Sequence, residues 1–370
     1  MNGIVLENLS KSYKSETVLD GVSLTVPEGR MLVLFGPSGA GKTVLLRCIA
    51  GAVDPDAGKV VLGGVDVTGF EPEDRGVGMA FQNFALFPHM TAEENIASPL
   101  KARRSTKTIV RQGVDAVARL LKIDHVLSHP PKALSNGQKQ RTSLARALVA
   151  QPHYLLLDDP LRNVDAKLRY EMRLELPRLL ADQGATVIYV TQDYKEAMAF
   201  GDQIAVLDGG RIVQAGTPED IYLRPATIGI SELFGDPTIN LLDVVPERDE
   251  RGIYITLSDQ RIPLGDGYDA AVGKPCTLGL RPEALAFTDL ETGIPVVIEA
   301  ETPFNEKTVT LALTKRGREV LVSRPAGMPG PAEGESAFVS VNWRALLLFD
   351  RQNGQRIVPE GESGRTEAAA

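Results

Sequence analysis

The sequence has few cysteines and histidines and no excess of positive charge. Its two cysteines, Cys48 and Cys276, lie far apart, which fits a reducing cytosol without disulfides. The four histidines show no metal-ligand spacing, so a histidine-based metal site is not expected. The formal net charge is −8, and no block of Lys and Arg is suited to wrapping nucleic acid. A nucleic-acid partner is therefore not expected.

Long hydrophobic runs are also missing. No apolar stretch approaches the ~20 residues needed to cross a bilayer. Residues 1–10 lack a basic segment followed by an apolar one, so no secretory signal is visible. Hydrophobic residues at 43% and charged residues at 24% are ordinary for a globular protein. The sequence predicts a soluble cytosolic protein, and its 370 residues favour two domains.

The most specific motif is a phosphate loop of the form G-x-x-x-x-G-K-[ST]. It consists of Gly36, Pro37, Ser38, Gly39, Ala40, Gly41, Lys42 and Thr43. The apolar run 31–35 predicts a buried strand before it, and 43–50 predicts a helix after it. Backbone N–H groups of such a loop and the helix N-terminus attract phosphate. We expect Lys42 to reach the β- and γ-phosphates and the Thr43 hydroxyl to ligate Mg²⁺.

Another apolar run, 154–157, leads into two carboxylates, Asp158 and Asp159. This run is typical of a buried parallel strand, whose carboxyl end lines the ligand site of an α/β sheet. An acidic residue there is the expected second anchor for Mg²⁺. The run 185–190 has the same form and leads into Thr191 and Gln192.

Three further positions allow two interpretations each. Gln82 ends a predicted strand and is expected to point into the ligand crevice, although it could be a surface-loop residue. Tyr13, expected in a loop, could stack on a nucleobase for ~1–3 kcal/mol or pack at a strand edge. Ser135 and Gly137 begin a helix and could receive an anion, but in isolation a plain N-cap is the simpler interpretation of Ser135. Thr91 and Glu94 form a capping box that opens another helix.

The pattern of elements changes near residue 235. We predict an α/β domain over residues 1–235 with a helical subdomain at about 84–150, and a β-rich domain over 236–359. Closely spaced β-like runs suggest a small barrel in the second domain. These runs cover residues 253–257, 275–280, 295–300, 308–313, 319–322 and 336–341. Residues 360–370 predict a disordered tail.

As a set, these stretches resemble the ATP-binding subunit of an ABC transporter, over nearly the whole chain. The resemblance is strongest to the ATPases of bacterial carbohydrate importers of the maltose and glycerol-phosphate type. The matching motifs are Walker A at 36–43, the Q-loop region at 81–91, the signature at 134–138, Walker B at 155–158 and the D-loop at 163–165. Segments typical of this importer branch are 216–218, 221–222, 224–225, 240–242, 280–283 and 349–350 with Gly354.

The resemblance implies a P-loop NTPase fold with a mixed sheet and a helical subdomain, followed by an OB-like, TOBE-type β-rich domain. It implies an ATPase that uses ATP and Mg²⁺ to drive uptake of a sugar, glycerol or glycerol phosphate. The implied location is peripheral, on the cytoplasmic face of the inner membrane. Two permease subunits and, indirectly, a periplasmic solute-binding protein are the implied partners, and two nucleotide domains pair head to tail around two ATPs.

The family's residue roles carry over to matching positions. Tyr13 would stack on adenine, Gln82 would sense Mg²⁺ and the membrane partner, and Asp158 would hold Mg²⁺. The partner subunit's site would be contacted by Ser135, Asn136, Gly137, Gln138 and Asp165.

Several positions depart from the family pattern. Asp159 replaces the glutamate that polarises the attacking water, and a carboxylate set back by roughly 1 Å can lower a rate by ~10²-fold. Gln192 replaces the switch histidine, and loss of one oriented donor costs on the order of 10²–10³ in rate. Asn136 replaces the second signature glycine, and Arg162 stands where this branch commonly has serine.

These departures fall in two places. Asp159 and Gln192 belong to the site built on this chain's own phosphate loop, whereas Asn136 faces the partner's ATP. We therefore predict pairing with a second, catalytically complete ATPase subunit, which leaves this chain's own site slow. The alternatives are a slow homodimer and a non-hydrolysing regulatory ATP-binding module. A soluble ABC ATPase acting on ribosomes or DNA generally carries fused cassettes or coiled-coil arms, which this sequence does not show.

Overall fold

The computed structural model describes residues 2–361. The predicted tail falls largely on residues 362–370, which lie outside the described residues. The chain divides into two compact units between Pro218 and Glu219, and each is described by itself. Within residues 2–361, no helix has both the length and the apolar character needed to span a membrane.

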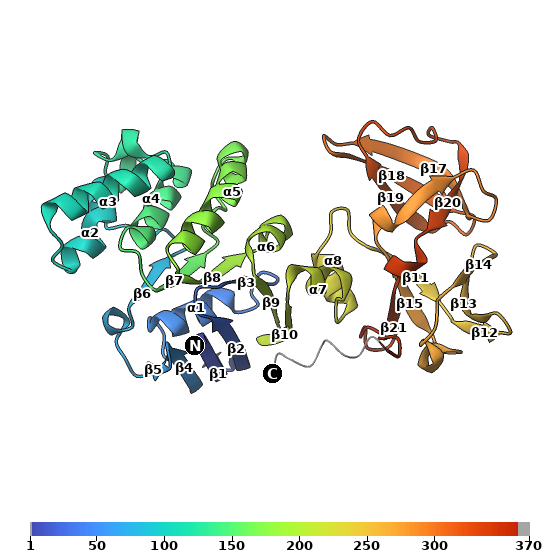
Figure 1. Cartoon of the computed structure of the whole chain (residues 1–370), viewed down its shortest axis with the longest axis horizontal. Coiled ribbons are helices and arrows are strands. Elements are labelled where there is room, and N and C mark those ends of the chain that lie inside the picture. Colours follow the sequence, from blue (N-terminus) through green and yellow to red (C-terminus); the bar gives the residue numbers. More distant parts are fainter. Residues whose placement is uncertain (1, 362–370) are drawn as a thin grey trace. The chain divides into compact units, whose positions relative to one another are not determined.

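The first unit is organised around a six-stranded mixed sheet with the strand order β10-β9-β3-β8-β7-β6 (Figure 1). Its strands are β3 (Met31–Phe35), β6 (Val77–Ala80), β7 (Tyr154–Asp158), β8 (Thr186–Thr191), β9 (Gln203–Asp208) and β10 (Arg211–Gly216). Only β10 pairs antiparallel. Strands β3 and β8 are buried at every position because helices and the second sheet cover both faces. This sheet brings the carboxyl ends of β3, β7 and β8 to one edge.

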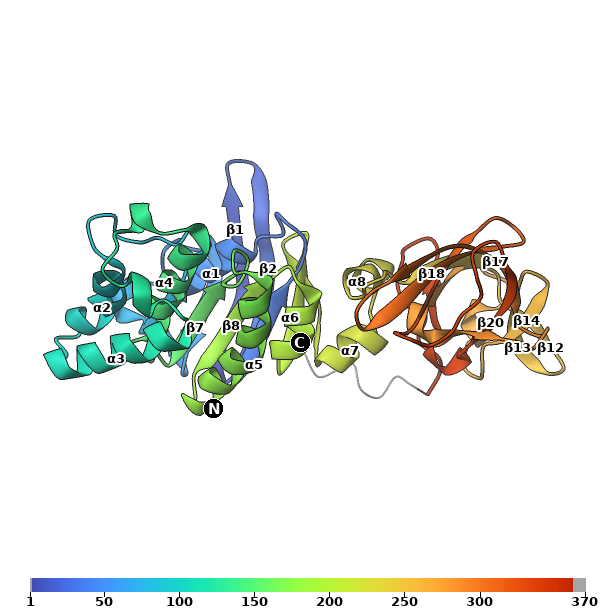
Figure 2. The same ribbon diagram turned by 90° about the horizontal axis from the view of Figure 1, so that it is seen from above.

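A second, antiparallel sheet of order β2-β1-β4-β5 belongs to the same unit. Its strands are β1 (Asn2–Tyr13), β2 (Glu16–Pro27), β4 (Ala57–Leu62) and β5 (Val65–Asp66). Strands β1 and β2 form a long hairpin (Figure 2). Tyr13 is the last residue of β1 and pairs with Glu16, so its predicted place in a loop is wrong. The two-residue turn after Tyr13 lets the ladder continue to the hairpin's tip.

The helices of the first unit include those expected after the phosphate loop, after Thr91 and after Ser135. They are α1 (Lys42–Ala50), α2 (Ala92–Ala102), α3 (Lys107–Leu120), α4 (Asn136–Leu148), α5 (Ala166–Asp182) and α6 (Tyr194–Phe200). Figure 1 shows α2, α3 and α4 grouped together beside the sheet, as the predicted helical subdomain. The capping box of α2 is confirmed, because the Thr91 hydroxyl accepts from the Glu94 N–H and the Glu94 carboxylate accepts from the Thr91 N–H.

The first unit's core lies between the two sheets and α1. Leu45, Leu46 and Ile49 of α1 are fully buried against apolar residues of both sheets. Burying a leucine or isoleucine side chain contributes ~1.5–3 kcal/mol. This packing holds the N-terminus of α1 at the carboxyl end of β3, where the phosphate loop lies.

The second unit contains two short helices, α7 (Pro218–Leu223) and α8 (Ile228–Leu233), followed by strands. The break at 218 falls before the predicted domain boundary at 235. One reason is that the Arg281 guanidinium donates to the backbone carbonyls of Tyr222, Ser231 and Phe234, which fastens both helices to the later strands. The predicted domain limits, 1–235 and 236–359, stay a prediction.

The second unit is β-rich, as predicted, and all six predicted runs are strands. Its strands are β11 (Asn240–Val244), β12 (Glu247–Asp249), β13 (Gly252–Leu257), β14 (Gln260–Pro263), β15 (Cys276–Leu280), β16 (Leu285–Thr288), β17 (Ile294–Pro303), β18 (Lys307–Thr314), β19 (Glu319–Pro325), β20 (Ser336–Val341) and β21 (Leu347–Asp350). They form sheets of order β11-β15-β21, β12-β13-β14 and β16-β20-β17-β18-β19. One apolar cluster, including Ile255, Leu278 and Leu348, fills the space among them.

Candidate nucleotide site

The phosphate loop lies between β3 and α1, as the sequence predicts. Glycine is required at position 36, because a Cβ there would lie 2.1 Å from the carbonyl oxygen of Leu207. The Lys42 ammonium donates to the carbonyls of Gly36 and Pro37 at 2.7 and 2.6 Å. Lys42 is only 6% exposed, and this burial lowers its pKa, against the opposing effect of Asp158 and Asp159. The loop therefore positions a buried cation beside its own backbone.

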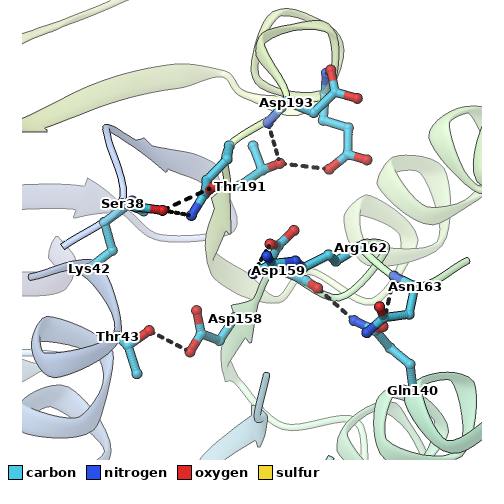
Figure 3. Close-up of polar contacts among 12 residues, drawn as sticks. Ser38, Lys42, Thr43, Gln140, Asp158, Asp159, Arg162, Asn163, Thr191 and Asp193 are labelled. Carbon is cyan, nitrogen blue, oxygen red and sulfur yellow. Dashed lines mark hydrogen bonds and ion pairs between the residues drawn. The ribbon is translucent and has the colours of Figure 1, made fainter. Parts of the chain in front are cut away.

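Thr43 and Asp158 meet at the base of this loop. The Thr43 hydroxyl, in the first turn of α1, donates to Asp158 Oδ2 at 2.9 Å (Figure 3). Asp158 ends β7 and is buried, which raises its pKa, while the Thr43 hydrogen bond lowers it. A hydroxyl and a carboxylate are the hard oxygen ligands that Mg²⁺ prefers. The pair therefore fits a Mg²⁺ ion bound together with nucleotide phosphates.

A cavity of about 270 Å³ opens above these residues. The elements that line it are β2, the phosphate loop, the start of α1, the loop after β6, the ends of β7 and β8 and the loops that follow these two strands. Its lining residues are Val18, Ser38, Gly39, Ala40, Gly41, Lys42, Thr43, Val44, Gln82, Asp158, Asp159, Arg162, Val190 and Gln192. The structure therefore brings Gln82, Asp158, Asp159 and Gln192 to one cavity with the phosphate loop. Tyr13, Ser135 to Gln138 and Asp165 do not line it.

The backbone of Asp159 is held from two sides. Its N–H donates to the Val190 carbonyl at 3.0 Å, and its carbonyl accepts from Gln140 Nε2 at 2.6 Å. Its φ of 50° is left-handed, an uncommon conformation for a non-glycine residue. Burial, followed by the nearby Glu196 carboxylate, raises the pKa of Asp159 to about 6. The structure thus leaves this carboxylate little freedom to move by backbone shifts.

Gln192 follows β8 and lines the same cavity. Its Nε2 donates to Ser38 Oγ at 3.2 Å, so its side chain contacts the phosphate loop directly. An amide can donate a hydrogen bond here but carries no positive charge.

Two buried residues that support these side chains were missed by the sequence analysis. Gln140 of α4 is 2% exposed and also accepts from the Asn163 N–H at 3.0 Å, so it joins the signature helix to the loop after β7. Glu196 of α6 accepts from the hydroxyls of Tyr189 and Thr191, each at 2.9 Å. Burial raises the pKa of Glu196. The only sequence signal for either is a polar residue at a position that helical periodicity would bury.

The signature residues begin α4 outside the cavity. Ser135 is the N-cap and forms a capping box with Gln138, so the simpler interpretation of Ser135 matches its local contacts. Asn136 is exposed and starts the helix. A Cβ at Gly137 would lie 2.9 Å from the Asn163 carbonyl, so the helix and the D-loop touch at a glycine. Asp165 caps α5 and accepts from the Leu168 N–H at 3.0 Å.

Tyr13 presents its ring to solvent at the tip of the β1–β2 hairpin. It is 46% exposed, and the Lys11 ammonium lies 5.6 Å from the ring centroid. This contact does not bury the ring, which remains accessible to a flat partner.

Comparisons with known proteins agree on the family. A family model described as "ABC transporter" matches residues 19–162, and one described as "MalK OB fold domain" matches residues 235–285. The sn-glycerol-3-phosphate import ATP-binding protein UgpC of Escherichia coli K12 is 38% identical over 360 residues, which cover 96% of this chain and all of that protein. UgpC of Salmonella typhi is similar to the same extent.

A solved structure resembles part of the chain. The dimeric ATP-binding cassette MJ0796 in a post-hydrolysis state, bound to ADP and Pi, has a TM-score of 0.55 and 29% sequence identity. The likeness covers 58% of this chain and 98% of that one.

Proposed function

This chain belongs to the ATP-binding subunits of ABC importers, and from that membership we propose that it couples ATP to the uptake of a glycerol phosphate, a polyol such as glycerol, or a sugar. It is an ABC ATPase with a MalK-type OB domain. The name of the UgpC relatives supports a glycerol phosphate as the first substrate to test. Membership also implies two permease subunits and a solute-binding protein as partners, and a peripheral position at the inner membrane.

The observation that carries ATP binding is the cluster of Lys42, Thr43 and Asp158 at the base of the cavity. Lys42 would leave the loop carbonyls for the β- and γ-phosphates, which are stronger acceptors because they are charged. Thr43 and Asp158 would hold Mg²⁺, which neutralises charge on the phosphates. Tyr13 would stack on adenine, and Gln82 would report the state of the cavity to the permeases.

The residues that would promote hydrolysis are poorly suited to that role. Asp159 would accept the proton of the attacking water, but its side chain is one methylene shorter than glutamate. Because hydrogen bonds from both sides fix its backbone, the strand end is poorly placed to shift and restore the lost ~1 Å. Gln192 would donate one hydrogen bond near the γ-phosphate without the charge of an imidazolium.

We further propose that the chain pairs with a second, catalytically complete ATP-binding subunit. Asp159 and Gln192 both line this chain's own cavity, whereas Ser135, Asn136 and Gly137 lie outside it. A heterodimer would confine the two costly residues to one site, and Ser135 and Gly137, with Asn136, Gln138 and Asp165 beside them, would contact the partner's nucleotide. The solved structure of MJ0796 is described as dimeric, which supports pairing of two such domains. It does not indicate whether the two domains in this transporter are alike.

The test begins with the purified chain alone. We expect it to bind ATP and to hydrolyse it at least ~10²-fold more slowly than the double variant Asp159→Glu with Gln192→His. Lys42→Ala in the double variant is the control and should abolish the regained turnover. Rapid hydrolysis by the unmodified chain, or no gain in the double variant, would contradict the assignment of a slow site.

The substrate and partner are tested in the assembled transporter. The chain is co-expressed with the permeases, the binding protein and any second ATPase encoded beside it. We expect sn-glycerol 3-phosphate, glycerol or a sugar to stimulate its ATPase activity, and one copy of this chain per transporter. Two copies with equal turnover would contradict the heterodimer.

A further inference from the structure

Arg162 is a charged residue of the cavity to which the family pattern gives no role. We propose that Arg162 binds the terminal phosphate of ATP in this chain's own site and supplies the positive charge that Gln192 lacks. This inference rests on the proposed binding of ATP. It adds a residue that distinguishes a nucleoside triphosphate from a diphosphate.

The backbone of Arg162 is fixed at the cavity wall. Its N–H donates to the Asp159 carbonyl at 3.3 Å, and its own carbonyl accepts from Arg169 Nη2 at 3.0 Å. The side chain lines the cavity together with Lys42, Asp158 and Gln192. Figure 3 shows Arg162 beside Asp159, on the wall formed by the loop after β7. Arg162 is therefore part of the site and not of a remote surface.

The guanidinium has no hydrogen-bond partner among residues 2–361 that would hold it away from a ligand. Its closest anion is Asp159, with 3.9 Å between Nη1 and Oδ2, and the side chain is 52% exposed. An ion pair this loose and this exposed contributes little to stability. A guanidinium carries five N–H donors in a planar fork that matches phosphate oxygens. Exchanging the loose pair for a phosphate is therefore favourable.

The charged residues that line the cavity also support a role for a second cation. Lys42 and Arg162 are the only basic residues that line it within the described chain, against the carboxylates of Asp158 and Asp159. Lys42 sits at the base, on the carbonyls of the phosphate loop. With a neutral amide at position 192, Arg162 is the remaining lining cation that is not bonded to the loop. The outermost phosphate is the group that a residue on this wall would contact.

The experiment compares binding of two nucleotides to the full-length chain. Dissociation constants for the β,γ-imido analogue of ATP and for ADP, each with Mg²⁺, are measured by calorimetry for Arg162→Ser and Arg162→Lys. Arg178→Ser is the matched control, because Arg178 is an exposed arginine of α5 that does not line the cavity. We expect Arg162→Ser to weaken the triphosphate analogue ~10-fold, the low end for a charge-assisted hydrogen bond, and ADP less than about twofold. Arg162→Lys should recover much of the loss, and the control should change neither constant.

Three results would overturn the proposal. The first is equal weakening of both nucleotides, and the second is no weakening of either. The third is disappearance of the effect in an Asp159→Asn background, because Arg162 would then act through Asp159 and not on phosphate. A different result would show that the proposed function itself is wrong. The unmodified chain would then bind neither nucleotide, and Lys42→Ala would not change either dissociation constant.

Discussion

Replacing Asp159 by asparagine should stabilise the nucleotide-free chain, although it removes the residue that we propose activates water. Burial and the nearby Glu196 raise the pKa of Asp159 from its ordinary 3.8 to about 6. The folded chain therefore retains a proton that the unfolded chain releases, so stability falls as the pH rises from about 4 to about 6. Above that window the whole penalty is present, and asparagine, which does not ionise, escapes it.

The size of the gain follows from the same values. A rise in pKa from 3.8 to about 6, at ~1.4 kcal/mol for each tenfold change, corresponds to an upper limit of ~3 kcal/mol. The Asp159 side chain is only 13% exposed, so solvent screening reduces this figure little. We expect Asp159→Asn to raise the free energy of unfolding by ~2–3 kcal/mol near pH 7.5 and by well under 1 kcal/mol near pH 4.

Urea unfolding in EDTA without nucleotide, followed by far-ultraviolet circular dichroism, measures this difference, because the long helices belong to the first unit. Asp182→Asn is the control, since Asp182 is an exposed carboxylate at the end of α5 and its replacement should change stability little. Equal gains for Asp159→Asn at the two pH values, or a loss near pH 7.5, would show that the carboxylate is not strained by its surroundings.

Three other predictions concern side chains of the first unit. Gln140→Leu removes the shorter of two hydrogen bonds to the Asp159 carbonyl and leaves the Asn163 N–H without its acceptor, so it should cost ~1–3 kcal/mol in urea unfolding and weaken ATP binding. An unchanged stability would contradict the bridging role. Arg146 of α4 donates to the carbonyls of Phe84 and Ala85, two residues with positive φ. Arg146→Met removes these hydrogen bonds. It should lower permease-stimulated ATPase activity several-fold in the reconstituted transporter and leave ATP affinity unchanged. Burial raises the pKa of Cys48 to about 11, so mass spectrometry should find no iodoacetamide adduct on Cys48 near pH 8 until the chain is unfolded.

Local patterns were sufficient to predict the base of the nucleotide site. A fully apolar run followed by acids predicted β7 and Asp158, and a glycine-rich loop predicted the start of α1 close to its observed position. Both signals are short-range, because a buried parallel strand and a phosphate loop each require particular residues next to one another. Residues 31–35 form β3 as predicted for the same reason.

What the sequence did not reveal depends on contacts between distant segments. Gln140 forms hydrogen bonds with Asp159 and Asn163, which belong to a different segment of the chain, so no local sequence pattern indicates these contacts. Arg281 draws α7 and α8 toward the later strands, which moves the break between compact units away from the change in composition at 235. Tyr13 was expected in a loop, yet the β1–β2 pairing extends to Tyr13 itself.

The arrangement of the cavity separates holding a nucleotide from hydrolysing it. Lys42, Thr43 and Asp158, which would bind phosphate and Mg²⁺, keep the residue types and contacts that this chemistry requires. Asp159 and Gln192, which would act only on the attacking water and the transferred phosphoryl group, have changed to a shorter acid and a neutral amide. Because binding energy common to ground state and transition state does not speed the chemical step, we expect such a site to bind ATP well and to turn it over slowly. A cation at Arg162 would strengthen the hold on ATP and supply the charge that Gln192 lacks, but it would leave the shortened acid at position 159 unchanged.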